Sequence, residues 1–412
     1  MIESVIFFFS GSGVVMLFIL FMRINVVGSK SKLVKHRSKE PGFVDLLIYA
    51  SVVDEGVIVG KDGSLMAAWA YQGVDSNSST EAERDQVSLQ INHALSRMGS
   101  GWMIHIDAVR KPAPGYSAKD DSHFPDPVSA AIDEERREFF ERVGTLYESN
   151  YVITATYLPP LLAQQKFVEL MFDDEGVPVD SKTRTIALLN HFKRECANIE
   201  SHLSSVFRMK RLKGKTITKE DNSSVNYDAF LRWIQFCISG LDHPVILPRN
   251  PIYLDALLSG QEFWGGVVPK IGQNFIQVVS IEGFPLASSP GLINSLADLP
   301  CLYRWSTRFI FMDTHEAVGH LEKFSKKWKQ KIRSFFDQVF NSHSSNVDQN
   351  AINMVSDAQA AIAETNSGEV AQGYYTSVVV LMSESRGDLE ASARQVAKAI
   401  NHLGFAARIE TI

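Results

Sequence analysis

The chain has 412 residues, of which 45% are hydrophobic and 21% are charged, and its formal net charge is −6. This length allows two or three domains with large cores, and the negative charge excludes an overall field that would attract DNA or RNA. Its three cysteines are far apart and lie in apolar runs, which argues against a disulfide framework or a zinc site and predicts buried free thiols.

The N-terminal residues are unusually apolar. Residues 5–22 contain no charged side chain, and as a helix they would extend about 27 Å, close to the hydrocarbon thickness of about 30 Å. Basic residues from Arg23 to Lys39 follow, and the positive-inside rule then leaves the bulk of the chain in the cytoplasm. We therefore predict a transmembrane anchor over residues 1–27 and a basic juxtamembrane linker over residues 28–46. A signal peptide and a peripheral apolar hairpin stay open as alternatives.

Residues 47–160 are predicted to form a first α/β lobe. Asp62-Gly63 is a hairpin-turn signal between two apolar runs, and Ser78 with Glu81 suggests a capping box at the start of a helix. Alternating and helical apolar periodicities then place the remaining elements. These predicted elements are a hairpin (56–71), a helix that ends at Gly99, a strand (102–109), a charged helix (128–143) and a strand (151–157).

Residues 161–270 are predicted to be a helical middle region, and residues 271–412 a second α/β lobe that is ferredoxin-like. The predicted fold class is therefore α/β (α+β): an N-terminal transmembrane helix followed by mixed two-layer β-α-β lobes with a helical insertion. The chain ends at Ile412 in or just after a predicted strand, which suggests that the natural polypeptide continues.

The tripeptide Gly214-Lys215-Thr216 resembles the end of a phosphate-binding P-loop. Such a loop needs a glycine where Met209 stands, and it should follow a buried strand rather than a basic segment. Asp313 ends an apolar run like a magnesium-binding acid, but a helix N-cap explains it more simply. We therefore predict no catalytic, cofactor-binding or metal residue and no cofactor in this chain. An unrecognised nucleotide site at Lys215 and Asp313 is kept as an alternative.

A basic helix around residues 323–333 carries five lysines and an arginine against Glu322. Its aromatic residues, such as Phe324 and Trp328, fit a core stripe with the lysines facing water. The alternative is a nucleic-acid-binding module that uses residues 323–333.

Several long stretches resemble the TrbE-type proteins of plasmid conjugation, within the CagE/TrbE/VirB family of type IV secretion ATPases. The resemblance covers nearly the whole chain in unbroken order. The matching stretches include VVDEGVIVGKDGSLMAAW (52–69), RMGSGWMIHIDAVRKPAP (97–114), DEERREFFE (133–141), YLDALLSGQEFWGG (253–266), VVSIEGFPLASSPG (278–291), YRWSTRFIFMD (303–313), KKWKQKIRSFFDQVF (326–340), GYYTSVVVLM (373–382) and LGFAARIETI (403–412).

The resemblance implies an N-terminal portion of an ATPase at the cytoplasmic face of the bacterial inner membrane. The P-loop motor domain of the family, with its ATP and magnesium, would be absent from this chain. The implied role is an interaction and assembly domain that docks the ATPase to inner-membrane components of the transfer apparatus, for conjugation and pilus assembly, and that associates with copies of itself.

Overall fold

The computed structural model describes residues 42–73, 78–159, 179–218, 224–248, 252–285, 289, 291–339 and 349–411. The chain divides into two units, residues 1–48 and residues 49–412, and each is described by itself. In the first unit the described residues form the short helix α2 (Phe43–Leu46), whose Asp45 side chain accepts a hydrogen bond from the Gly42 N–H at 2.8 Å.

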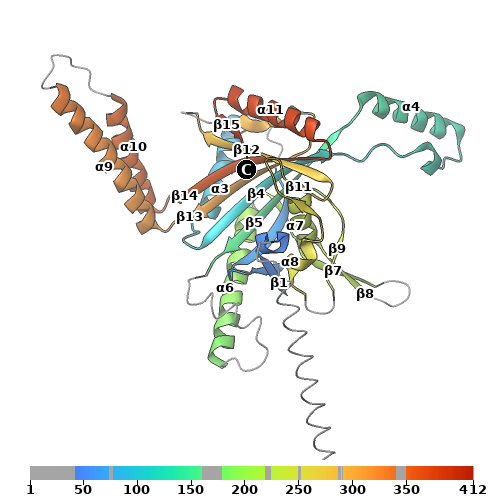
Figure 1. The fold of residues 1–412 in the computed structure, drawn as a ribbon, viewed down its shortest axis with the longest axis horizontal. Coiled ribbons are helices and arrows are strands. Elements are labelled where there is room, and N and C mark those ends of the chain that lie inside the picture. Colours follow the sequence, from blue (N-terminus) through green and yellow to red (C-terminus); the bar gives the residue numbers. More distant parts are fainter. Residues whose placement is uncertain are drawn as a thin grey trace, which may run out of the picture. The chain divides into compact units, whose positions relative to one another are not determined.

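A twelve-stranded sheet forms the frame of the second unit (Figure 1). Its strands are β1 (Tyr49–Asp54), β2 (Val57–Gly60), β3 (Leu65–Gln72), β4 (Trp102–Pro112), β5 (Tyr147–Tyr157), β6 (Arg208–Arg211), β10 (Phe263–Trp264), β11 (Lys270–Ile271), β12 (Asn274–Gly283), β13 (Tyr303–Phe311), β14 (Gly373–Ser383) and β15 (Ala406–Ile409). The order is β1-β2-β3-β5-β4-β13-β14-β12-β11-β10, with β6 beside β3 and β15 beside β12. All of these pairings are antiparallel.

A second, three-stranded sheet has the order β7-β8-β9. Its strands are β7 (Gly214–Thr218), β8 (Ser224–Asp228) and β9 (Val245–Ile246). The helices of this unit are α3 (Glu81–Leu95), η1 (Lys119–Asp121), α4 (Pro127–Val143), α6 (Val179–Leu203), α7 (Ala229–Ser239), α8 (Leu254–Leu258), η2 (Leu292–Asp298), α9 (Thr314–Val339), α10 (Gln349–Ser367) and α11 (Arg386–His402).

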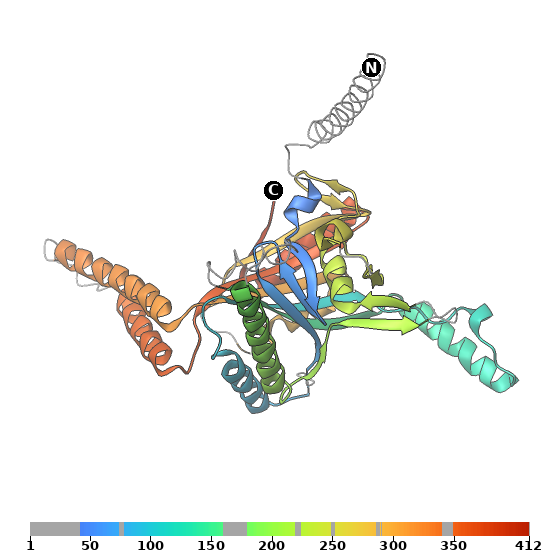
Figure 2. The same ribbon diagram turned by 90° about the horizontal axis from the view of Figure 1, so that it is seen from below.

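One face of the large sheet carries two hydrophobic cores. Helices α3 and α6, which lie side by side in Figure 2, cover the first core around Trp69 and Ile104, and α11 covers the second around Val379 and Leu381. Side chains alternate between the faces of a strand, and four odd residues of β13 belong to these cores: Tyr303, Trp305, Phe309 and Phe311. The even residues of β13 therefore point to the opposite face, which α7 covers.

The described residues contain no helix that is both long and apolar enough to cross a membrane. The prediction of an N-terminal transmembrane helix, and with it a location at the inner membrane with a single span, is therefore corrected. Residues 5–22, on which that prediction rested, lie outside the described residues.

The prediction of separate two-layer β-α-β lobes is also corrected. Strand β4 from the first third of the chain pairs with β13 from the last third, in register from Tyr303–Arg110 to Ile310–Met103, so one antiparallel sheet runs through both regions. A strand edge leaves backbone N–H and C=O groups without partners, and pairing the two edges satisfies them.

Several local predictions agree with the structure, and others shift. The hairpin at Asp62-Gly63 is confirmed by the pairing of β2 with β3. The capping box of α3 is formed by Thr80 and Glu83, two residues later than predicted, with the Thr80 N–H donating to Glu83 at 2.8 Å. Helices are confirmed at α6 and α7, but the short strands β6, β7 and β8 between them were not predicted.

Candidate functional site

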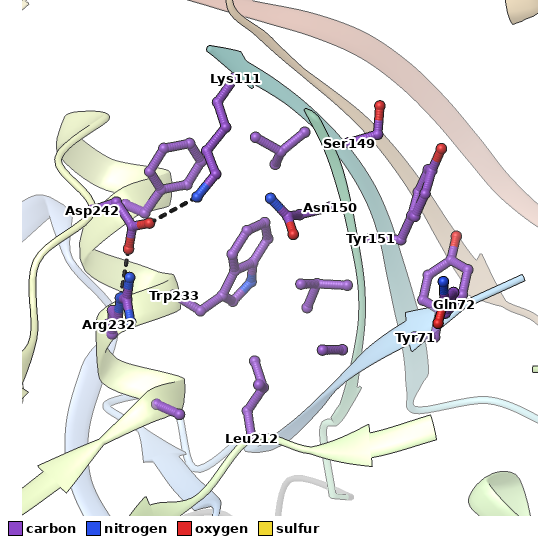
Figure 3. A pocket seen from close by; sticks show the side chains of 15 residues that line it. Tyr71, Gln72, Lys111, Ser149, Asn150, Tyr151, Leu212, Arg232, Trp233 and Asp242 are labelled. Carbon is purple, nitrogen blue, oxygen red and sulfur yellow. Dashed lines mark hydrogen bonds and ion pairs between the residues drawn. The ribbon is translucent and has the colours of Figure 1, made fainter. Parts of the chain in front are cut away.

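A groove of about 550 Å³ lies between α7 and the face of the large sheet that α7 covers (Figure 3). Its walls come from parts of the chain that are far apart in the sequence: β3, the end of β4, the first half of β5, Leu212 after β6, and α7 with the loop that follows it. The side chains labelled in Figure 3 are Tyr71, Gln72, Lys111, Ser149, Asn150, Tyr151, Leu212, Arg232, Trp233 and Asp242.

Helix α7 is fixed firmly at both ends. Asp228 is its N-cap, and the carboxylate accepts hydrogen bonds from the N–H groups of Phe230 at 2.8 Å and Leu231 at 2.9 Å. Gly240 ends the helix with φ of 75°, in the left-handed region that favours glycine. A Cβ at Gly240 would lie 2.7 Å from the Met382 sulfur and 2.9 Å from an Asn274 side-chain nitrogen, so any other residue would have to displace these two side chains.

The turn after Gly240 brings Asp242 to the rim of the groove, between two cations. One carboxylate oxygen accepts a hydrogen bond from Lys111 Nζ at 3.0 Å, and the other accepts from Arg232 Nε at 2.5 Å. Lys111 also contacts Glu148 at 3.2 Å. Partial burial alone would raise the pKa of Asp242, but the hydrogen bonds from Arg232 and Lys111 outweigh it and hold that pKa below its ordinary value. The network therefore ties α7 to β4 and β5.

The wall of the groove combines aromatic and amide groups. Trp233 points into the groove from α7 with Phe236 beside it, the ring centroids 5.9 Å apart (Figure 3). Asn150 faces Trp233 from β5, and Tyr71 and Tyr151 lie at the far side with ring centroids 5.5 Å apart. An apolar surface with a few polar groups suits recognition of a ligand or of a partner's side chain.

The structure separates the two residues of the alternative nucleotide site into different environments. Gly214-Lys215-Thr216 begins strand β7, paired with β8, so the tripeptide lacks the loop-to-helix geometry of a phosphate cradle. Asp313 caps α9 by accepting a hydrogen bond from the Glu316 N–H at 2.8 Å, as predicted for an N-cap. The three cysteines are free; Cys196 and Cys301 are buried as predicted, whereas Cys237 is half-buried.

The basic helix 323–333 lies in α9, which packs against α10. Lys323, Lys326, Lys327 and Lys329 are exposed, and Lys326 lies 3.5 Å from Glu322. Phe324, which was expected in a core stripe, is 45% exposed. Nucleic-acid binding by this surface stays the alternative prediction.

The groove itself was not anticipated from the sequence. Its key ion pair joins Lys111 and Asp242, which are 131 residues apart. The local signals were the Asp228 cap, the apolar face of α7 and the glycine stop at Gly240. These signals predict that α7 is a helix packed on one face, but they do not predict that it packs against β3, β4 and β5.

Two regions of the chain match known families. Residues 56–165 match the N-terminal domain of the type IV secretion system ATPase VirB4/TrbE, and residues 215–412 match the CagE, TrbE, VirB family, a component of the type IV transporter system. The chain therefore belongs to the CagE/TrbE/VirB family of type IV secretion and conjugal-transfer ATPases.

Its curated relatives carry the name conjugal transfer protein TrbE. The protein of Rhizobium radiobacter is 43% identical over 379 residues, which are 91% of this chain and 46% of the relative. Sinorhizobium fredii has a probable conjugal transfer protein TrbE in two separate pieces. The first piece is 49% identical over 30% of this chain and 84% of its own length, and the second is 41% identical over 54% of this chain and 33% of its own length. This chain spans about half the length of the Rhizobium radiobacter relative that it matches.

Proposed function

We propose that this chain is a partner-binding and assembly portion of a conjugal-transfer ATPase, and that it docks the ATPase to other components of the secretion apparatus. The observation that carries the proposal is the groove beside α7. Its wall combines aromatic and amide side chains, which suit the binding of a partner's side chains, and the chain belongs to a family of secretion components. Tryptophan and arginine are frequent among the residues that dominate protein–protein binding energies, and the groove has both in Trp233 and Arg232.

We further propose that ATP hydrolysis resides outside this chain. This is supported by the position of Lys215 in a paired strand and by the N-cap role of Asp313. Purified chain should show no saturable ATP binding by equilibrium dialysis. Micromolar binding that is lost in Lys215→Ala would overturn this aspect of the proposal.

The docking role is tested by plasmid transfer from donor cells that lack the corresponding gene. The full-length protein with Trp233→Ala should restore transfer about tenfold less well than wild type, at equal protein level, because a central aromatic contact is lost. The matched control is Trp264→Ala, since Trp264 is 63% exposed and does not line the groove. Equal transfer by both variants and wild type would refute a role for the groove.

A further inference from the structure

Helix α4 is held on an arm that leaves the main sheet. Strand β13 pairs with β4 only as far as Arg110, and β3 pairs with β5 only from Tyr151 onward. Beyond these points β4 and β5 pair only with each other, through Lys111–Glu148 and Pro112–Tyr147, and α4 lies in the connection between them (Figure 1). The arm is therefore a two-stranded ribbon that carries a helix.

One face of α4 is occupied within the arm. Arg137 is buried there, paired with Asp133 at 2.6 Å and Glu134 at 2.5 Å, and its Nε donates to the Ser117 carbonyl at 3.1 Å. The Tyr116 hydroxyl donates to Asp133 at 2.7 Å, and its ring stacks on Phe140 with centroids 5.2 Å apart. These contacts fix the helix and set which face points away.

The opposite face exposes a row of apolar side chains, here named the α4 stripe. It consists of Val128, Ile132, Phe139 and Val143, which are 64%, 50%, 55% and 47% exposed. At 3.6 residues per turn, all four lie within a sector of about 60°. Single exposed apolar residues are ordinary, but an aligned row on one helix is typical of a surface that packs against another helix.

Two opposite charges flank the middle of the α4 stripe. Glu135 and Arg136 lie about 50° to either side of its centre, by the same helical geometry. Both are exposed, and neither forms an ion pair with another of the described residues. When two such helices pack in parallel with their stripes facing each other, Glu135 of each helix lies beside Arg136 of the other. The pair of helices then has one Glu135–Arg136 ion pair on each of its two edges. Antiparallel packing would instead place Glu135 beside Glu135 and Arg136 beside Arg136.

We propose that a second copy of this chain covers the α4 stripe, by parallel pairing of the two α4 helices with Glu135–Arg136 ion pairs on both edges. The proposal rests on the assembly role and names the surface through which copies meet. One pair of 17-residue helices buries less than the area of an average stable interface, so the dissociation constant should be on the order of 10 μM.

Sedimentation equilibrium of the purified chain measures this pairing directly. Ile132→Gln with Phe139→Gln should weaken dimerisation about tenfold or more, because the central apolar contact is lost. Glu135→Arg should also weaken it, and adding Arg136→Glu should restore it by exchanging the two charges. Leu89→Gln is the matched control, since Leu89 is 68% exposed on α3, and it should change nothing.

The direction of pairing is tested by a disulfide. Ile132→Cys should cross-link to the same residue of the second copy under mild oxidation. Cross-linking only in a mixture of Ile132→Cys with Phe139→Cys would mean antiparallel packing and would overturn the proposal. A wild-type chain that stays monomeric at about 100 μM, or stripe variants that dimerise as wild type does, would overturn it as well.

This outcome is separable from the docking role. A failure of dimerisation would leave the expected transfer defect of Trp233→Ala unchanged, because the groove does not include α4. A normal dimer with no effect of Trp233→Ala would refute the groove and leave the α4 pairing standing.

Discussion

Arg304 on β13 and Asp107 on β4 form an ion pair across the seam where the two halves of the sheet meet, with the half-buried Arg304 placing Nη1 3.1 Å from the buried Asp107 carboxylate. The Asp107 residue is 3% exposed. Cys237 of α7 also lies near this pair, because, beside the larger rise caused by burial, Arg304 lowers the pKa of its thiol and Asp107 raises it. The seam is thus held by backbone pairing and by one charge on each strand.

Removal of one partner of this pair should destabilise the fold strongly. Asp107→Ala leaves the half-buried Arg304 guanidinium without its counter-charge, which costs about 2 kcal/mol in the free energy of unfolding, less than for a fully buried pair. Urea denaturation followed by circular dichroism measures the change. The double variant Asp107→Leu with Arg304→Met should recover much of the loss, because no unpaired charge is then buried. A single variant as stable as wild type would show that the pair does not hold the seam.

Substitution of Gly240 should loosen α7. Gly240→Ala forces a side chain into the left-handed conformation and against Met382, so we expect a loss of about 2 kcal/mol in the free energy of unfolding. Gly319→Ala is the control within α9, where a Cβ meets no atom within 4 Å, and it should stabilise by up to about 1 kcal/mol. Equal melting temperatures for the two variants would contradict the role of Gly240.

The contribution of Asp242 should depend on pH in a defined direction. Its pKa is lowered in the folded state, so its ionised form stabilises the fold above the unfolded-state value of about 4, and that contribution disappears as the pH falls through the folded-state pKa. The stability difference between wild type and Asp242→Asn, measured by urea titration, should therefore be largest near neutral pH and shrink below about pH 4. A difference that grew toward acid pH would contradict the ion network at the groove.

The three cysteines should react slowly with thiol reagents in the folded protein. Burial raises the pKa of the Cys196 and Cys237 thiols to about 12 and raises that of Cys301, so little reactive thiolate forms at a mildly alkaline pH of about 8. Labelling followed by mass spectrometry should be slow in native buffer and complete in denaturant. Rapid labelling of the native chain at Cys196 would contradict the packing of α6 on the sheet.

The sequence predicted local structure well where the signal is itself local. The Asp62-Gly63 turn, the α11 face with Leu389 and Ile400 buried, and the Asp313 cap all follow from residues a few positions apart. The short strands β6 to β8 were missed because they carry no clear alternation, and β7 is largely exposed.

By itself, the sequence determined the family, the alternation of strands and helices, and the free cysteines, because each depends on residue identities or on periodicity along the chain. Tertiary structure alone decided that β4 pairs with β13, that Lys111 meets Asp242 beside α7, and which face of α4 remains exposed. Those contacts join residues up to about two hundred positions apart. Their partners are chosen by burial and by the pairing of strand edges, neither of which leaves a periodic mark in the sequence.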